Sequence, residues 1–284
     1  MGICRYRGAG AQRYRGAGAQ ERRGTGAQVP KQDSKTARQK NMYKDKTVSL
    51  ILPTFNEKDS IKKAVTDFEN LGIIDEIIVV NNNAAPGTSE EIKNTSAREV
   101  LEPEQGYGSS IIRGFKESNG DLVAVCEPDD TFLARDILKL LAYIDDVDIV
   151  YGTRTYKELI WSGANMGWFL RFGNWAVAKM MEVLFNTNTI TDVGCTYRVI
   201  RKEALSDLLP SFMVKSNFFG PEMMVRGYIK KYKCLQVPVV YKERIGKSSV
   251  TGNLGKAFIL GMKMIILLFI MRFKADRVIL KYFK

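Results

Sequence analysis

The sequence contains no histidine in its 284 residues. This absence excludes Ser-His-Asp and Cys-His catalysis, zinc sites with histidine ligands and an imidazole general base. Cysteine is also scarce, with 4 scattered residues that show no C-x-x-C spacing, and no secretory signal is evident. We therefore expect free thiols in a reducing, cytosolic protein.

Acidic residues are scarce at both ends of the chain, and the net charge of +12 is concentrated there. Residues 1–46 carry 12 Lys/Arg and 3 Asp/Glu, and residues 244–284 carry 9 and 1, so the segment between them has a net charge of −5. A globule of this sign is not typical of a nucleic-acid-binding domain, so we expect no nucleic-acid partner. Two basic ends favour a protein that rests on an anionic membrane surface.

Apolar residues are nearly missing from the first 28 positions, which repeat an eight-residue unit. RYRGAGAQ occurs at 5–12 and 13–20, and ERRGTGAQ follows at 21–28. Because this composition offers little to bury, the sequence predicts a disordered basic tail over residues 1–46.

From Thr47 onward, apolar segments typical of strands alternate with segments typical of helices. Strands are predicted at 48–52, 76–80, near 100, 122–126, 148–151, near 196–200 and at 232–240. Helices are predicted from a cap at Asp59 to about Leu71, from a capping box at Thr88 and Glu91, and at 109–118, 132–144, 165–185, 202–209 and 220–230. This alternation predicts one α/β domain over 47–250, with a mostly parallel sheet and helices on its faces.

The end of the chain is apolar on nearly all sides. Residues 257–271 carry a single charge, Lys263, and the flanking residues are basic. The run is shorter than the roughly 20 apolar residues that a membrane span needs. A core helix is one interpretation. We favour a helix at the membrane interface, within a segment covering 251–284, because basic flanks suit an anionic lipid surface.

The segment GDLVAVCEPDDTF, residues 120–132, ends an apolar strand abruptly at three carboxylates, Glu127, Asp129 and Asp130. In open α/β sheets, ligands bind at the carboxyl ends of such strands. Three neighbouring acids repel one another unless a cation neutralises them. Glu127 and Asp129 thus frame a D-x-D-like pair that could hold a divalent metal on a diphosphate. A solvated acidic turn is the alternative, and for Asp130 we favour capping of the next helix.

Eight segments of the chain match, in order, the motifs of the family 2 glycosyltransferases. They are ILPTFNE (51–57), DEIIVVNNNAAPGT (75–88), QGYGSSIIRG (105–114), GDLVAVCEPDDTF (120–132), DIVYGTR (148–154), TDVGCTYRVI (191–200), FFGPE (218–222) and YKERIGKSS (241–249). Over residues 47–250 the chain therefore resembles this family, and within it the branch of dolichol-phosphate mannose synthase and the polyprenyl-phosphate sugar transferases.

The resemblance implies a GT-A (Rossmann-like) fold and a reaction. A sugar would pass, with inversion, from a nucleotide-diphosphate sugar to a polyprenyl (dolichyl or undecaprenyl) phosphate, with Mg²⁺ or Mn²⁺ as cofactor. The enzyme would lie peripherally on the cytoplasmic face of a membrane and serve cell-envelope glycan synthesis. Two alternatives stay open: transfer to a hydroxyl acceptor such as a saccharide, and a non-catalytic module that binds nucleotide sugars.

The resemblance also implies sets of site residues. Those expected at the nucleotide sugar are Pro53, Thr54, Asn56, Glu57, Asn81, Asn82, Gly106, Gly108, Glu127 and Asp129. Those expected at the acceptor phosphate are Arg171, Arg198, Arg244 and Lys247. The metal is expected on Asp129, with Glu127 or Asp130 nearby, and the catalytic set is Asp129, Asp192, Glu222 and Arg154.

Several of these residues have competing interpretations. The family usually has aspartates where this chain has Asn81, Asn82 and Glu127. Arg154 follows a strand end, where it either meets phosphate or forms a salt bridge, and Arg198 could simply face solvent. A hydroxyl acceptor needs a base, for which Asp192 and Glu222 are the candidates. A lipid phosphate, with a second pKa of about 6, attacks as an anion without one.

Overall fold

The computed structural model describes residues 43–246, 254–273, 279 and 281–283. The octapeptide repeats of the predicted tail and the expected phosphate ligand Lys247 lie outside these residues. Residues 43–46, which the sequence analysis assigned to the tail, form a short turn in which Tyr43 pairs with Lys46. Lys44 and Lys46 both form ion pairs with Asp145, at 3.1 and 2.7 Å.

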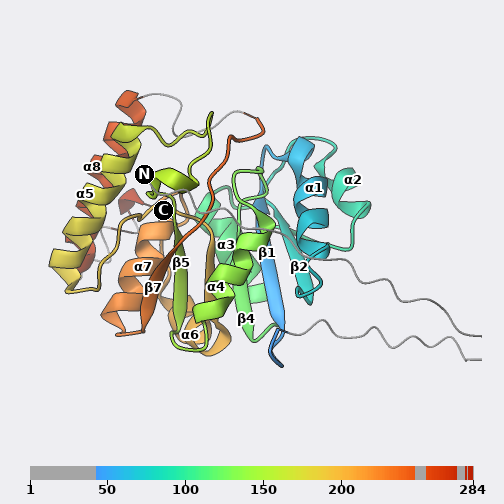
Figure 1. Ribbon diagram of the computed structural model, residues 1–284, viewed down its shortest axis with the longest axis horizontal. Helices are drawn as coiled ribbons and strands as arrows, with labels where there is room; N and C mark the ends of the chain where they lie inside the picture. The colour runs from blue at the N-terminus through green and yellow to red at the C-terminus, as the bar shows by residue number, and fades with distance from the viewer. Residues whose placement is uncertain (1–42, 247–253, 274–278, 280, 284) are drawn as a thin grey trace, which may run out of the picture. The chain divides into compact units, whose positions relative to one another are not determined.

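A seven-stranded sheet forms the centre of the described chain (Figure 1). Its strands are β1 (Val48–Thr54), β2 (Glu76–Asn81), β3 (Arg98–Leu101), β4 (Leu122–Val125), β5 (Ile149–Thr153), β6 (Arg198–Arg201) and β7 (Cys234–Pro238). Their spatial order is β3-β2-β1-β4-β6-β5-β7. Of these strands β6 alone runs antiparallel to its neighbours, so the predicted mostly parallel sheet is confirmed.

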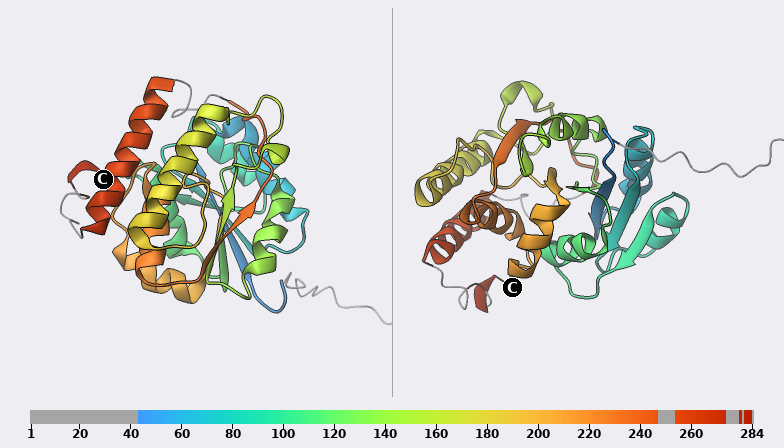
Figure 2. Two further views of the ribbon diagram at one scale, coloured as in Figure 1. Left: turned by 60° about the vertical axis from the view of Figure 1, so that its left-hand side comes forward. Right: turned by 90° about the horizontal axis from the view of Figure 1, so that it is seen from below.

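Helices cover both faces of the sheet (Figure 2). They are α1 (Lys58–Glu69), α2 (Thr88–Lys93), α3 (Tyr107–Glu117), α4 (Ile137–Tyr143), α5 (Trp168–Phe185), α6 (Lys202–Leu208), α7 (Phe219–Ile229) and α8 (Leu254–Arg272). Successive residues of β1 point to opposite faces. Ile51 therefore packs in one core cluster with α3, α5, α6, α7 and α8, and Leu50 and Leu52 pack in another with α1, α2 and α4.

Three predicted helix caps are wrong. Asp59 lies inside α1, which begins at Lys58 with Glu57 at the capping position. The residue that caps α2 is Gly87, whose φ of 89° lies in the left-handed region that glycine tolerates best, and Thr88 is already helical. Asp130 caps no helix, because its carboxylate forms ion pairs with Lys63 at 2.8 Å and Lys242 at 2.9 Å. The helical segment after it begins with a 3₁₀ turn at Ala134–Asp136.

The C-terminal helix α8 packs against α5 and α7. Met264, Leu267, Leu268 and Met271, spaced at helical intervals, belong to the larger core cluster. The opposite side is apolar too, yet it is open to solvent, with Phe258, Ile259, Met262, Ile266 and Phe269 between 41% and 60% exposed. The core interpretation thus accounts for one side of α8 only. None of the helices in the described part of the chain is long and apolar enough to cross a membrane.

We expect neighbouring substitutions on α8 to separate its two sides. Leu267→Ala removes a fully buried side chain and should lower the free energy of unfolding by about 2–5 kcal/mol. Ile266→Ala, at a position that is 50% exposed, should change it by roughly 0.5 kcal/mol or less. Denaturant titration measures both values. Equal losses would show that the exposed side is also covered by protein.

Candidate active site

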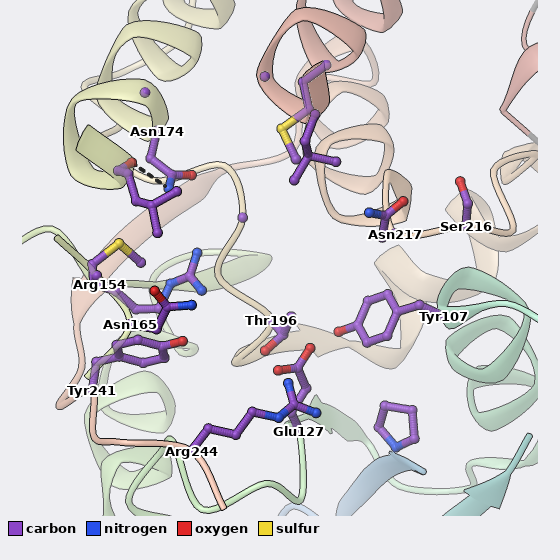
Figure 3. A pocket seen from close by; sticks show the side chains of 18 of the residues that line it. Tyr107, Glu127, Arg154, Asn165, Asn174, Thr196, Ser216, Asn217, Tyr241 and Arg244 are labelled. Carbon is purple, nitrogen blue, oxygen red and sulfur yellow. Dashed lines mark hydrogen bonds between the residues drawn. The ribbon is translucent and has the colours of Figure 1, made fainter. Parts of the chain in front are cut away.

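A cavity of about 1000 Å³ opens at the carboxyl ends of β1 and β4, where ligands bind in open α/β sheets (Figure 3). On the sheet side its wall is polar, with Asn56, Glu57, Glu127 and Arg154 among the lining residues. On the other side the wall consists of α5 and α8 and is largely apolar. The cavity therefore joins a polar end to an apolar end.

Most residues expected at the nucleotide sugar line the polar end. Pro53, Thr54, Asn56, Glu57, Asn82, Gly106 and Glu127 all do so. Asn81, Gly108 and Asp129 do not line the cavity. Asn81 instead holds its own loop, because its amide donates to Glu99 Oε1 at 2.8 Å and accepts from the backbone N–H of Ala84 at 2.8 Å.

Asn82 clamps the loop of residues 102–106. Its Nδ2 donates to the carbonyl oxygens of Glu102 (2.7 Å) and Glu104 (2.8 Å). Its Oδ1 accepts from the Gly106 N–H at 2.8 Å and from Gln105 Nε2 at 3.0 Å. All four hydrogen-bonding positions of the amide are used, and an aspartate could not donate to the two carbonyls. This explains why an asparagine suits a position where the family usually has an acid.

The glycines of the 105–114 motif serve close packing. Gly106 has a φ of 153°, and a side chain there would collide with the backbone carbonyl of Lys215. A side chain on Gly108 would collide with the carbonyl of Val214. These contacts press the start of α3 against the segment before α7, which shapes this edge of the cavity.

Asp129 and Glu57 are bridged by Arg244. Its Nη1 lies 3.1 Å from Asp129 Oδ2, and its Nη2 lies 2.6 Å from Glu57 Oε1. Asp129 is fully buried, and its other oxygen accepts hydrogen bonds from Thr131. The expected acceptor ligand Arg244 therefore lies beside Asp129, expected at the metal, and Glu57, expected at the nucleotide sugar.

Backbone hydrogen bonds strap the segment containing Arg244 onto the loop after β4. The N–H of Lys242 donates to the Thr131 carbonyl at 2.8 Å, and the N–H of Ile245 donates to the Asp129 carbonyl at 3.0 Å. The ion pair between Lys242 and Asp130 adds a third link at 2.9 Å. We call residues 241–246 the strap. Asp130, expected near the metal, is thus paired with Lys242 of the strap and with Lys63 of α1.

Glu127 lines the cavity next to this bridge. Burial and the nearby charge of Asp129 raise the pKa of Glu127 to about 8, against the opposing effect of Arg244 and Arg154. The phenol of Tyr107 and the hydroxyl of Thr196 point toward it (Figure 3). Sequence reasoning missed both residues, although Tyr107 lies between the two glycines of a motif that it had singled out.

Arg154 lines the cavity, and it also forms a two-point ion pair with Asp192. The distances are 2.9 Å from Nε to Oδ2 and 3.0 Å from Nη2 to Oδ1. Backbone N–H groups of Arg154 and Gly194 also donate to Asp192, each at 2.9 Å. Burial acts to raise the pKa of Asp192, but the Arg154 charge outweighs it and the pKa lies below its ordinary range. The expected salt bridge of Arg154 is therefore present, and its position at the cavity leaves the phosphate role a prediction.

Neither candidate base faces the cavity. Asp192 is buried behind Arg154 with both oxygens bonded, and Glu222 is fully buried. Glu222 accepts hydrogen bonds from the N–H groups of Met213 (3.0 Å) and Val214 (2.8 Å) and from Arg226 Nε (2.9 Å). Burial raises its pKa. Both carboxylates therefore form buried ion pairs and hydrogen bonds that stabilise the fold.

Two expected acceptor arginines lie elsewhere. Arg198 is 2% exposed, so the solvent-facing interpretation is wrong. Its guanidinium donates to the carbonyls of Cys195 and Gly220 and lies 5.3 Å from the ring of Tyr151. Arg171 lines a separate pocket on the outside of α5.

The residues at the polar end suit a divalent cation bound together with a diphosphate. Among the described residues, no three Asp, Glu or Cys side chains converge as a self-sufficient metal cage. Asp129 Oδ2 is nevertheless buried without a hydrogen-bond partner, and the group facing it is the cation of Arg244. Mg²⁺ is commonly held by one or two carboxylates plus substrate phosphates, which matches this donor set.

The sheet order, the strand-end cavity and its acidic edge define an enzyme of the GT-A class of glycosyltransferases. Residues 49–209 match the family model described as Glycosyl transferase family 2. The chain belongs to this family, and it is a glycosyltransferase.

Named relatives agree with this assignment. An uncharacterized glycosyltransferase of Mycobacterium tuberculosis is 30% identical over 209 residues, covering 73% of this chain and 91% of that protein. A dolichyl-phosphate hexose transferase of Haloferax volcanii is 25% identical over 213 residues, covering 75% and 90%. Glucosyl-3-phosphoglycerate synthase of M. tuberculosis, solved with Mn²⁺, UDP and phosphoglyceric acid, shares the fold with a TM-score of 0.62 at 15% identity, covering 80% of this chain and 78% of that one.

We expect Asp192→Asn to lower the free energy of unfolding. Removing one partner of a buried ion pair costs about 3–5 kcal/mol, because the remaining charge is left buried. Because the pKa of Asp192 is lowered in the folded protein, its ion pair contributes to the free energy of unfolding above the ordinary pKa of 3.8. This contribution is lost as the pH falls through the lower pKa of the folded state. Urea titrations at several pH values measure this.

The matched control is Asp207→Asn, which breaks the exposed ion pair with Lys230 and should change stability little. A stable Asp192→Asn protein that has lost an activity-linked titration would instead identify Asp192 as a catalytic base.

Proposed function

We propose that the protein transfers a sugar, with inversion, from a nucleotide-diphosphate sugar to a polyprenyl phosphate. The observation that carries this proposal is the two-ended cavity. Beyond Arg154 it continues between α5 and α8, where Phe169, Leu170, Val177, Met264 and Ile265 line it. A phosphate with a long apolar chain matches both ends, whereas a small polar acceptor leaves the apolar end unused.

The position of the carboxylates also supports a phosphate acceptor. Asp192 and Glu222 are committed to buried ion pairs, so neither is free to take a proton from an acceptor hydroxyl. A phosphate acceptor needs no such base, since it attacks as an anion. The similarity to a dolichyl-phosphate hexose transferase favours the same acceptor class.

In the proposed reaction, the cavity arginines position the two phosphate groups. Arg154 keeps its side chain at the cavity while Asp192 fixes its orientation, so it can meet the acceptor phosphate. Glu57 and Glu127 lie where the ribose and the sugar of the donor would arrive. Mg²⁺ or Mn²⁺, held by Asp129 with Glu127 nearby, would offset the charge that develops on the departing diphosphate.

A hydroxyl acceptor is the second candidate, and one observation favours it. Glu127 lines the cavity with a pKa raised to about 8, close to the pH at which a general base is most effective. In that case Glu127, and not Asp192 or Glu222, would be the base. The membrane position is likewise a proposal: the exposed apolar side of α8 would lie in the cytoplasmic surface of an anionic membrane.

The proposal is tested with radiolabelled UDP- and GDP-sugars offered to undecaprenyl phosphate, dolichyl phosphate and the matching free alcohols, each with and without Mn²⁺. Transfer to a phosphate and not to its alcohol is the expected result. Transfer to alcohols or saccharides alone would establish the hydroxyl acceptor, and binding of donor without any transfer would indicate a non-catalytic module.

We expect Gly261→Leu to block the apolar end of the cavity selectively. Gly261 lines the cavity from α8, and a Cβ there has no atom within 4 Å, so the larger side chain can enter without a clash. The KM for a long-chain lipid phosphate should rise more than tenfold, while the KM for the nucleotide sugar stays unchanged. Ile266→Phe, on the exposed side of α8, is the control. An unchanged lipid KM in Gly261→Leu would place the acceptor chain elsewhere.

We expect Arg244→Gln to bind Mn²⁺ more tightly than the parent protein when no nucleotide is present. The guanidinium lies 3.1 Å from Asp129 Oδ2 and therefore repels a second cation at that carboxylate. The affinity should rise at least tenfold, as measured by electron paramagnetic resonance of free Mn²⁺. Lys63→Gln is the control, because Lys63 pairs with Asp130 on the outer side. Equal or weaker binding in Arg244→Gln would separate Arg244 from the metal position.

A further inference from the structure

A second pocket, of about 490 Å³, lies on the outer side of α5. Its lining residues are Thr155, Tyr156, Trp168, Arg171, Phe172, Trp175 and Thr191. Phe172 is the one residue that also lines the main cavity. The pocket thus combines four aromatic rings, one of them a phenol, with one cation and two threonine hydroxyls.

The large apolar side chains of this pocket are exposed to water, whereas its charged side chain is sheltered. Trp168 is 74% exposed, Phe172 59% and Trp175 45%, whereas the charged Arg171 between them is half-buried. Phe172 and Trp175 stack on each other with their ring centroids 5.9 Å apart. Such large rings in water, around a sheltered cation, indicate that this face meets something other than water.

The cation of Arg171 is available for a ligand. No carboxylate lines the pocket. Among the described residues, no ion pair or side-chain hydrogen bond engages the Arg171 guanidinium, and the other charged residues of α5, Lys179 and Glu182, pair with each other at 2.6 Å. A sheltered arginine without a counter-ion attracts an anion, and its planar fork matches phosphate oxygens at two points.

We propose that this pocket binds the phosphate headgroup of an anionic membrane phospholipid. Tryptophan and tyrosine are the side chains enriched at headgroup depth in membrane proteins, because their rings are apolar and their edges are polar. Thr155 and Thr191 form the polar edge of the pocket, but their hydroxyls bond to each other at 2.9 Å and Thr191 also donates to Gln236. The guanidinium of Arg171 is therefore the group left to meet the phosphate. This role is separate from turnover and does not require that the acceptor be a polyprenyl phosphate.

The neighbouring helix extends the same surface. α5 and α8 lie side by side in both views of Figure 2, as the yellow and the red helix, and they pack on each other. The open side of α8 is apolar, and the helix carries three basic residues and no acidic one. A second copy of the chain would bring like charges together on this surface, whereas an anionic bilayer complements them.

The experiment uses the full chain with vesicles of phosphatidylcholine alone or mixed with phosphatidylglycerol. In co-sedimentation, Arg171→Gln should weaken binding to the mixed vesicles more than fivefold, the loss that corresponds to about 1 kcal/mol for one basic residue at a membrane surface. Lys179→Gln, on the same helix, is the matched control, because Lys179 is already neutralised by Glu182. Brominated lipids should quench the tryptophan fluorescence of the parent protein more than that of Trp168→Phe.

Three results would overturn the proposal. Competition by inorganic phosphate at low concentration would identify a site for a soluble phosphate ligand. A dimer in sedimentation velocity that Arg171→Gln dissociates would identify a protein interface. A raised acceptor KM in detergent, with vesicle binding unchanged, would make Arg171 an acceptor ligand. Because vesicle binding is measured without a donor, its failure is distinguishable from failure of the proposed transfer reaction.

Discussion

Negative charge buried at the carboxyl edge of the sheet is the constraint on which the site depends. Asp129 and Asp192 are at most 1% exposed, and burying an unpaired carboxylate in a protein is costly. Each is therefore matched by an arginine from a distant part of the sequence, Arg244 for Asp129 and Arg154 for Asp192. The two arginines in turn line the cavity. The side chains that balance charge in the core thus also form part of the cavity wall.

The architecture was predictable because its signals are local. Every predicted strand and helix of the 47–250 domain has a counterpart, since apolar runs bounded by turn residues depend on neighbours in the sequence. The loops after β1 and β4 were also located, because in a parallel sheet they must share one edge. The caps at Thr88 and Asp130 were predicted wrongly, since a glycine in the left-handed region and two distant lysines decided them.

The partners of individual side chains could not be predicted from the sequence, because they depend on how distant segments pack. Arg198 stands between apolar neighbours in the sequence, a pattern that fits a solvent-facing residue equally well. One of the two carbonyls that it binds, that of Gly220, comes from the packing of α7. Arg171 is near the cavity in sequence, but the turn of α5 places it on the outer side. Asn82 departs from the family pattern for a reason visible only in its four hydrogen bonds.

The strap connects the C-terminal segment of the described chain to the loop after β4. Here the chain that leads to α8 first crosses the loop after β4, bonds to Thr131 and Asp129, and inserts Arg244 between two acidic side chains. A graft that replaced everything after β7 would also replace Arg244, the counter-ion of Asp129 and Glu57. Recombination between family members is therefore constrained to junctions after Gly246, and α8 can diverge only while the residues of the strap keep their contacts.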